Sequence, residues 1–423
     1  MRKTVGTLLG KSVAGAVHLR GKTGGQALPG LVVETLVPGY LGAILSQLPD
    51  GVVIVTGTNG KTTTTKMVVE LLRSNGKRVL TNPTGSNLTR GIISSVSQQA
   101  THTGRLPFDI AVFELDEAYA RQFTDVVKPR YVLGLNASRD QLDRFGEVDK
   151  VASLISETML SATDGIVVNA DDRRLRAAVA VTKVPLIYFG VAPKLLSYFP
   201  RDDELVSVGV TKKDAAPKPT LSVELATFEG ESASYRIENE TIDTKLQVTG
   251  QHNFQNAAAA LALTHALLPE IAASTLVAQL ADVQPAFGRG QTFKLKNGSE
   301  VQLNLVKNPA SFKQSLVSYV RPMATTMVAI NDRVADSRDV SWLWDVDFTS
   351  LQAVPLVYTT GTRAADMALR LQYDAVPVKA IEPNLDVALR TLCALPGDKV
   401  IFATYTAMLH LHAELARKAG KTL

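Results

Sequence analysis

One stretch of the sequence decides the fold: Val52-Val53-Ile54-Val55-Thr56-Gly57-Thr58-Asn59-Gly60-Lys61-Thr62-Thr63-Thr64-Thr65. The apolar run predicts a buried strand, the glycines predict a tight turn, and Lys-Thr opens a helix. Such a turn aims backbone N–H groups at a phosphate, and the helix N-terminus adds positive potential. The Lys61 ammonium can reach the terminal phosphates of a nucleotide, and the Thr62 hydroxyl suits Mg²⁺. We therefore predict that residues 57–62 bind the phosphates of a nucleotide.

The turn is a shortened form of the usual phosphate-binding loop. The general pattern has glycine at the position of Val55, with four residues between it and Gly60, whereas here Gly57 gives the compact sequence Gly-Thr-Asn-Gly-Lys-Thr. The same residues could instead form a glycine-rich turn with a capping threonine. The strand before the turn and the helix after it favour the phosphate loop.

Short Val- and Ile-rich runs alternate with helical patterns through residues 51–190. This alternation is typical of a mostly parallel, doubly wound α/β sheet. The predicted strands are Gly51–Thr56, Arg78–Asn82, Asp109–Leu115, Tyr131–Asn136, Gly165–Ala170 and Pro185–Gly190. Ligands of such sheets bind at the carboxyl ends of the strands. We therefore expect the polar groups that follow these strands, among them Glu114–Glu117 and Asn136–Asp143, to share one rim with residues 57–62.

The rest of the chain divides into further parts. Residues 192–250 alternate like strands and form a β-rich insertion, after which helical patterns return at His252–Leu268 and Ile271–Asp282. A second α/β series then runs to the C-terminus. We predict a basic N-terminal helical segment (1–40), a central ATP-binding domain (41–284) and a smaller, Rossmann-like C-terminal α/β domain (285–423).

Composition excludes several functional classes. The chain has 423 residues, 45% of them hydrophobic and 20% charged, as expected of a globular protein with two domains. The net charge of +5 is evenly spread and no basic-aromatic pattern occurs, so nucleic acid is not an expected partner. No uncharged apolar run approaches the ~18 residues of a membrane span. The single cysteine, Cys393, excludes an internal disulfide and a cysteine-cluster zinc site, and indicates a cytoplasmic setting.

The N-terminal segment is basic. Residues 1–33 carry Arg2, Lys3, Lys11, Arg20 and Lys22 and no acidic residue. Lys11 and the scattered glycines argue against a signal peptide. We expect a surface helix here, either simply exposed to solvent or attracted to an anionic membrane surface.

Three polar side chains are candidates for completing a nucleotide site. Glu114 ends a predicted buried strand, where a bound Mg²⁺ would neutralise its charge, whereas Asp116 and Glu117 are natural first-turn acids of the next helix. The amide of Asn256 could cap the Ala-rich helix that follows it or bind an adenine edge. Arg289, at the expected domain junction, could reach a γ-phosphate when the domains close.

The order of these motifs resembles that in the Mur ligases, a family that forms amide bonds through an acyl phosphate. Residues 57–62, Glu114, Gly-x-His-Asn-x-x-Asn at 250–256 and Gly288-Arg289 occur in the order seen there. More narrowly, the chain resembles the MurT family, the synthetase subunits of lipid II isoglutaminyl synthase. The segments that carry this narrower resemblance are Ala27–Gly30, Arg139–Glu147, Lys307–Pro309, Asn331–Asp332, Arg338–Phe348 and Thr360–Arg363.

The resemblance implies ATP and Mg²⁺ as cofactors, lipid II as substrate and a GatD-like glutaminase as partner. The early position of the phosphate loop leaves no room for the domain that holds a UDP-sugar precursor in soluble Mur ligases, and the chain has no credible glutaminase nucleophile of its own. Asp339 matches the MurT aspartate proposed to complete the Cys-His pair of GatD; otherwise it is an ordinary loop or N-cap residue before Ser341. The mixture of acids with Trp342 and Trp344 is typical of an interface.

Some positions depart from the family pattern. With one cysteine, the chain cannot carry the four-cysteine zinc ribbon that many MurT proteins have in the insertion, so no zinc is predicted. Gln141 stands where Mur ligases generally have a metal-binding histidine, and the spacing of Lys150 is wrong for the carbamylated lysine that many carry. The second metal site of the family would therefore lack its usual ligands.

The resemblance implies ATP-dependent amidation of the α-carboxyl of D-glutamate in the lipid II stem peptide, giving D-isoglutamine. Lys61, Glu114 and Asp339 are the predicted catalytic residues, and Thr62 and Glu114 the predicted metal ligands. The expected location is cytoplasmic, with peripheral contact at the inner face of the membrane as the alternative noted above. Two other functions remain open: a stand-alone amino-acid ligase of the Mur or folylpolyglutamate type, and a nucleotide-binding scaffold subunit.

Overall fold

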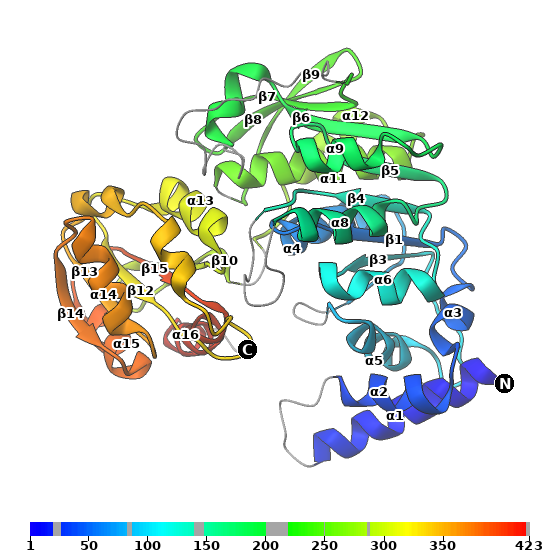
Figure 1. Cartoon of the computed structure of the whole chain (residues 1–423), viewed down its shortest axis with the longest axis horizontal. Coiled ribbons are helices and arrows are strands. Elements are labelled where there is room, and N and C mark those ends of the chain that lie inside the picture. The colour runs from blue at the N-terminus through cyan, green and yellow to red at the C-terminus, as the bar shows by residue number, and fades with distance from the viewer. Residues whose placement is uncertain are drawn as a thin grey trace. The chain divides into compact units, whose positions relative to one another are not determined.

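The computed structural model describes residues 1–19, 27–82, 87–138, 148–199, 219–248, 250–285 and 288–419, without the side chains of residues 18, 19 and 289. The chain separates into two compact units, each considered by itself below (Figure 1). Unit 1 comprises Met1–Ser138, Asp149–Leu246 and Asn253–Val283. Unit 2 comprises Arg139–Val148, Gln247–His252 and Gln284–Leu423. Among the described residues, no helix combines the length and the apolar character needed to cross a bilayer.

Unit 1 is built on a nine-stranded sheet of order β2-β3-β1-β4-β5-β6-β7-β8-β9. The pairs from β2 to β7 are parallel, and β7, β8 and β9 are antiparallel. Its strands are β1 (Val52–Thr56), β2 (Val79–Thr81), β3 (Ile110–Glu114), β4 (Tyr131–Gly134), β5 (Gly165–Asn169), β6 (Leu186–Val191), β7 (Val223–Glu229), β8 (Ser232–Ile237) and β9 (Glu240–Lys245). The β1 strand lies between β3 and β4 and is buried along its whole length, so it is an interior strand of this sheet.

Helices flank this sheet. They are α1 (Arg2–Leu19), α2 (Leu28–Leu36), α3 (Tyr40–Leu45), α4 (Lys61–Ser74), α5 (Thr89–Gln99), α6 (Glu117–Val126), α8 (Val148–Met159), α9 (Arg173–Val179), the 3-10 helix η1 (Pro193–Tyr198), α11 (Gln251–Leu267) and α12 (Ala273–Leu280). The α4 helix packs on β1, β2 and β3, and the turn before it lies at the carboxyl end of β1. The helices α1, α2 and α5 pack against one another and form a separate layer at the N-terminal end (Figure 1).

Unit 2 is a smaller α/β unit with a six-stranded sheet of order β10-β11-β15-β12-β13-β14. Only the β10–β11 pair is antiparallel. Its elements are β10 (Arg289–Lys294), β11 (Glu300–Leu305), α13 (Pro309–Tyr319), β12 (Thr325–Ala329), η2 (Ser341–Asp345), η3 (Thr349–Ala353), β13 (Val357–Thr360), α14 (Ala364–Tyr373), β14 (Val378–Glu382), α15 (Leu385–Ala394), β15 (Lys399–Ala403) and α16 (Tyr405–Lys418). Two apolar clusters, one on each side of the sheet's central strands, form the core of this unit.

The predicted fold class is confirmed. The six strands expected between residues 51 and 190 are all present and parallel, and the β-rich insertion contains β7, β8 and β9. One strand was not predicted: β10 lies where a domain junction was expected. It was missed because it is a strand only through its pairing with β11.

Candidate functional site

The phosphate-loop sequence forms a tight turn at the carboxyl end of β1. Gly57 (φ 134°) and Gly60 (φ 88°) both have backbone conformations that L side chains rarely adopt. A Cβ at Gly57 would lie 2.9 Å from the Leu135 Cβ, so the turn also approaches the end of β4 closely. Glycine is therefore required at both positions for the loop to keep this shape.

The loop is fastened to the segment that follows β4. The Asn59 N–H donates to the Asn136 side-chain Oδ1 (2.9 Å), and the Asn136 amide donates back to the Asn59 carbonyl (3.0 Å). The Thr58 N–H donates to the Asn136 carbonyl (2.9 Å), and the Ser138 N–H donates to the Thr58 hydroxyl (3.0 Å). Since these two loop N–H groups are engaged, the phosphate donors expected here are the N–H groups at the start of α4.

Lys61 is buried at the start of α4 and is paired. Its ammonium donates to Glu117 Oε2 at 3.0 Å, to the Gly57 carbonyl, and to the Thr58 carbonyl at 3.4 Å. Burial opposes the charged form, but the surrounding carboxylates, Glu117 foremost, raise the pKa of Lys61 above its usual value. Lys61 is therefore a cation at neutral pH, held by one carboxylate and two loop carbonyls.

Glu117 is the site residue that the sequence reasoning missed. Both Asp116 and Glu117 were predicted as first-turn acids; Glu117 is in the first turn of α6, whereas Asp116 is its N-cap, since its Oδ1 accepts from the Ala118 N–H at 3.1 Å. The Glu117 side chain nevertheless turns inward and is buried against Lys61. Its second oxygen, Oε1, is buried and has no hydrogen-bond partner in the described part of the chain. Nothing in the local sequence distinguishes this acid from a solvated first-turn glutamate.

Glu114 lies where it was predicted, at the end of β3 beside β1. Asn82 fixes this strand end: its amide donates to the Glu114 carbonyl (3.0 Å) and accepts from the Glu114 N–H (3.0 Å). The Glu114 charge is close enough to contribute to the raised pKa of Lys61. Thr62 follows Lys61 in α4 and is buried. The Glu114 carboxylate, the Thr62 hydroxyl and the buried, unsatisfied Oε1 of Glu117 are oxygen donors of the kind that bind Mg²⁺.

Asn256 is brought to the loop from a distant part of the sequence. It lies in the second turn of α11, and its amide donates to Asn253 Oδ1 at 3.0 Å. A Cβ at Gly60 would overlap Asn256 Oδ1, so this side chain lies directly against the turn. The predicted residues Gly57, Thr58, Asn59, Gly60, Lys61, Thr62, Glu114 and Asn256 all belong to unit 1.

The remaining predicted residues lie elsewhere. The backbone of Arg289 is in β10 of unit 2, paired with Asn304, and its side chain is outside the described part of the structure. Gln141 also lies outside the described residues. Lys150 is exposed at the start of α8. The role of Arg289 toward a γ-phosphate therefore stays a prediction.

Two of the segments of unit 2 that resemble MurT, Asn331–Asp332 and Thr360–Arg363, meet at the carboxyl edge of its sheet. Arg363 donates to Asp332 (Nε–Oδ2 2.8 Å), and the Thr362 N–H donates to Asn331 Oδ1 at 3.0 Å. The Asn331 amide donates to the Thr406 hydroxyl at 2.9 Å. Segments that are far apart in the sequence thus form one hydrogen-bonded rim after β12, β13 and β15.

Asp339 follows this rim and is half-buried. Its Oδ1 accepts from the Ser341 N–H at 2.8 Å, and hydrogen bonding to Ser341 lowers the pKa of the carboxyl. The capping geometry expected for an ordinary loop aspartate is therefore present. This hydrogen bond occupies Oδ1 of Asp339 and favours the ionised carboxylate. An ionised carboxylate is also what would be needed to orient a histidine from another protein.

The two tryptophans beside Asp339 differ in burial. Trp342 is buried against Phe312 (ring centroids 6.2 Å apart), so the interface prediction is wrong for this residue. Trp344 is 51% exposed, packs edge-to-face on the exposed Tyr373 (5.0 Å), and has the Arg370 guanidinium over its ring (5.4 Å). An exposed aromatic pair braced by arginine is the kind of group that anchors protein interfaces.

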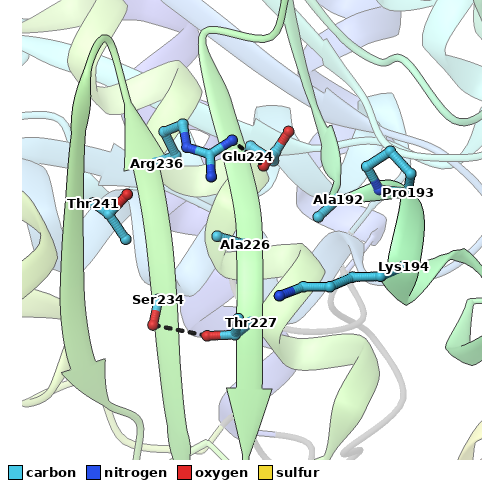
Figure 2. Close-up of a pocket in the computed structure, with 9 residues that line it drawn as sticks. All are labelled: Ala192, Pro193, Lys194, Glu224, Ala226, Thr227, Ser234, Arg236 and Thr241. Atoms are coloured by element: carbon cyan, nitrogen blue, oxygen red, sulfur yellow. Dashed lines mark hydrogen bonds and ion pairs between the residues drawn. The ribbon is translucent and has the colours of Figure 1, made fainter.

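A shallow depression of about 470 Å³ lies on the outer face of β7, β8 and β9 (Figure 2). Four of its polar side chains interact in pairs: Arg236 pairs with Glu224 (2.8 Å), and Thr227 donates to Ser234 (2.8 Å). Lys194 extends from η1 toward β7 (Figure 2). None of the lining residues belongs to the phosphate loop, so this depression is distinct from the nucleotide site. They are Ala192, Pro193, Lys194, Glu224, Ala226, Thr227, Ser234, Arg236 and Thr241.

Comparison with known families defines the class. A family model described as the Mur ligase middle domain matches residues 55–264, which contain the loop, Glu114, Glu117 and Asn256. A second model, described as MurT ligase C-terminal, matches residues 305–408 of unit 2. The MurF ligase of Thermotoga maritima, solved in complex with ADP, has the same fold: its TM-score is 0.64 at 18% identity, with 89% of this chain and 83% of that chain covered. The fold is therefore that of the Mur ligases.

Full-length relatives narrow this class. The lipid II isoglutaminyl synthase (glutamine-hydrolyzing) subunit MurT of Staphylococcus aureus (strain COL) is 28% identical over 99% of this chain and 98% of its own length. The subunit of the same name from Streptococcus pneumoniae (strain ATCC BAA-255 / R6) is 29% identical with the same coverage. The chain belongs to the MurT family of Mur-ligase-like proteins.

Proposed function

We propose that this chain is the ATP-consuming subunit of an enzyme that amidates the α-carboxyl of D-glutamate in the lipid II stem peptide. The observation that carries the proposal is the buried Lys61 with its carboxylate neighbours at a loop of the Mur ligase type. The full-length similarity to subunits named lipid II isoglutaminyl synthase supports the choice of reaction. The MurF ligase of the same fold, solved in complex with ADP, supports ATP as the nucleotide.

The reaction needs a carboxylate to be activated before nitrogen can replace its oxygen. A carboxylate oxygen attacks the γ-phosphorus of ATP, and the bond between this phosphorus and the oxygen that bridges it to the β-phosphate breaks. ADP departs, and the substrate becomes an acyl phosphate. Ammonia then attacks the acyl carbon, phosphate leaves, and nitrogen loses a proton to give the amide. The N–H groups at the start of α4 and the Lys61 ammonium would stabilise the charge on the transferring phosphoryl group.

Lys61 must change partners for this role. It now donates to Glu117 and to the carbonyls of Gly57 and Thr58. A polyphosphate in the turn would offer the ammonium stronger acceptors than the two carbonyls. Glu117 would then keep the lysine charged and oriented, while Asn256 supports the turn at Gly60. Arg289 would contact the nucleotide from unit 2.

Mg²⁺ would be held by the Thr62 hydroxyl and Glu114, with Glu117 Oε1 as a further oxygen ligand. When bound, it would offset the negative charge of the β- and γ-phosphates. The fit rests on the oxygen donor set and on the buried, unsatisfied Glu117 oxygen. No zinc is expected.

Ammonia would come from a GatD-like glutaminase bound to unit 2. Cys393, the one thiol of the chain, is half-buried in α15, and burial raises its pKa, which disfavours the thiolate. Asp339 would orient the partner's histidine. Trp344 and Tyr373, which are exposed and pack on each other, are candidates for the contact surface. The catalytic work would thus be divided between two subunits.

The test is reconstitution of the chain with its partner glutaminase, glutamine, Mg-ATP and lipid II, with mass spectrometry of the stem peptide. Asp339→Asn keeps an acceptor for the Ser341 N–H, so it should fold normally. It should lose glutamine-dependent amidation and retain amidation with added ammonium. Failure of the variant with both nitrogen sources would contradict the assigned role of Asp339. A requirement for an added amino acid would instead favour a stand-alone ligase, and ATP binding without an amide product would favour a scaffold subunit.

A further inference from the structure

The α1 helix packs on the protein through its smallest residues. Gly6, Thr7 and Gly10 are buried, and the Thr7 hydroxyl is hydrogen bonded to the Tyr40 hydroxyl at 2.9 Å. A Cβ at Gly6 would overlap the Tyr40 ring, and one at Gly10 would overlap the Ser97 side chain of α5. The backbone of α1 therefore lies directly against its neighbours, and only glycine permits that approach.

Among the larger aliphatic side chains of α1, Val5 and Leu8 point away from this contact, and Leu9 and Val13 lie at its margin. Val5 is 46% exposed, Leu8 is 45% exposed, and Leu9 and Val13 are only partly buried. Leu8 and Leu9 follow Val5 by three and four residues, and Val13 follows Leu9 by four, so these positions share one broad side of the helix. The α2 helix, which packs beside α1, adds the exposed Leu28 and Leu31. A surface helix normally buries its apolar side, so this inverted arrangement leaves an apolar surface for an external partner.

The charges around this surface are basic. The α1 helix contains Arg2, Lys3 and Lys11 and no Asp or Glu. Arg2 is exposed, and Lys11 lies at the edge of the helix, where it donates to the Gln98 carbonyl at 2.6 Å. The one acid of α2, Glu34, is paired with Arg90 at 2.7 Å. Aliphatic side chains with basic residues beside them are the features of helices that lie in the surface of anionic membranes.

We propose that the outward side of α1, carried by Val5, Leu8, Leu9 and Val13, docks on an anionic membrane surface. The basic residues of the helix and the absence of acids from it complement an anionic lipid surface and disfavour a neutral or basic protein. The choice also rests in part on the proposed function, because a lipid-linked substrate would be presented at such a surface. The helix lies in the surface and does not cross it.

The test is co-sedimentation of the full-length chain with vesicles. Vesicles of equal parts phosphatidylglycerol and phosphatidylcholine are compared with vesicles of phosphatidylcholine alone, at low and high ionic strength. The variant is V5S/L8S. The matched control is V317S/L369S, because Val317 (67% exposed) and Leu369 (50% exposed) are aliphatic helix residues of unit 2. All four positions are exposed, so each variant should unfold at the wild-type temperature.

We expect the wild type and V317S/L369S to sediment with the anionic vesicles, less at high ionic strength, and V5S/L8S to bind at least ~10-fold more weakly. Equal binding by all three proteins, or none by the wild type, would overturn the proposal. A change of oligomeric state in V5S/L8S, seen by light scattering without vesicles, would also overturn it and assign the surface to a second copy. Vesicle binding needs neither ATP nor substrate, so its failure would leave amidation of detergent-dispersed lipid II, and the proposed function, untouched.

Discussion

Replacing Gly60 by alanine perturbs the phosphate loop in two separable ways. Gly60 has φ 88°, where an L residue costs about 1–2 kcal/mol. The new Cβ would also overlap Asn256 Oδ1 and displace the amide that donates to Asn253. Loss of that hydrogen bond costs a further ~0.5–1.5 kcal/mol. We expect Gly60→Ala to lower the free energy of unfolding by about 1.5–3.5 kcal/mol and to weaken ATP binding at least ~10-fold.

Gly76 offers a matched control in the same unit. It has φ 82°, and a Cβ there would meet nothing within 4 Å. Gly76→Ala should therefore show the backbone cost alone, about 1–2 kcal/mol, and bind ATP like the wild type. Urea unfolding and calorimetric titration with Mg-ATP measure the two effects. The reasoning is refuted if both variants lose the same stability and bind ATP equally well.

Three further predictions concern charge and partner contacts. Glu117→Gln leaves the Lys61 ammonium without its buried counter-ion and should lower the free energy of unfolding by about 1–3 kcal/mol at neutral pH. Because pairing raises the pKa of Lys61, the difference in unfolding free energy between wild type and Glu117→Gln should shrink as pH rises above the usual lysine value of ~10.4. Urea unfolding across this pH range measures the difference, and a difference that stays constant would contradict the pairing. Hydrogen bonding to Arg78 lowers the pKa of Asp109 to about 2, so Asp109→Asn should melt below wild type at neutral pH. The two melting temperatures should converge as pH falls through about 2, and a gap that persists there argues against the pair. Trp344→Ala should weaken binding of the partner glutaminase by about 30-fold in surface plasmon resonance, while the exposed Met323→Ala should not; equal effects would remove Trp344 from the interface.

The strands β1 to β5 of unit 1 could be predicted because they are almost wholly buried and read as continuous apolar runs. The β1 run Val52–Thr56 is the clearest example, since it is followed at once by the glycine turn. The edge strand β10 could not be predicted in this way. Arg289–Lys294 mixes polar and apolar residues, and its identity as a strand depends on pairing with β11. Local periodicity carries no information on such a partner.

The site was predictable where the chemistry lies in consecutive residues and not where it depends on tertiary contacts. Residues 57–62 carry their own signal, whereas Glu117 differs from a solvated acid only because α6 directs it toward Lys61. Asn136 was expected on the rim, but its clamp on Asn59 depends on how β1 and β4 pair. Trp342 and Trp344 are two residues apart in η2, but only Trp342 packs on Phe312 and is buried in the core.

The most direct test of the central claim is the mass of the lipid II stem peptide after reaction with glutamine, Mg-ATP and the partner glutaminase. Lys66, further along α4, provides the control on the same helix. The account predicts the conversion of one carboxyl to an amide by the wild type and by Lys66→Ala, and none by Lys61→Ala, with glutamine hydrolysis retained in all three complexes. An unmodified stem peptide in every reaction, or equal amidation by Lys61→Ala, would contradict it.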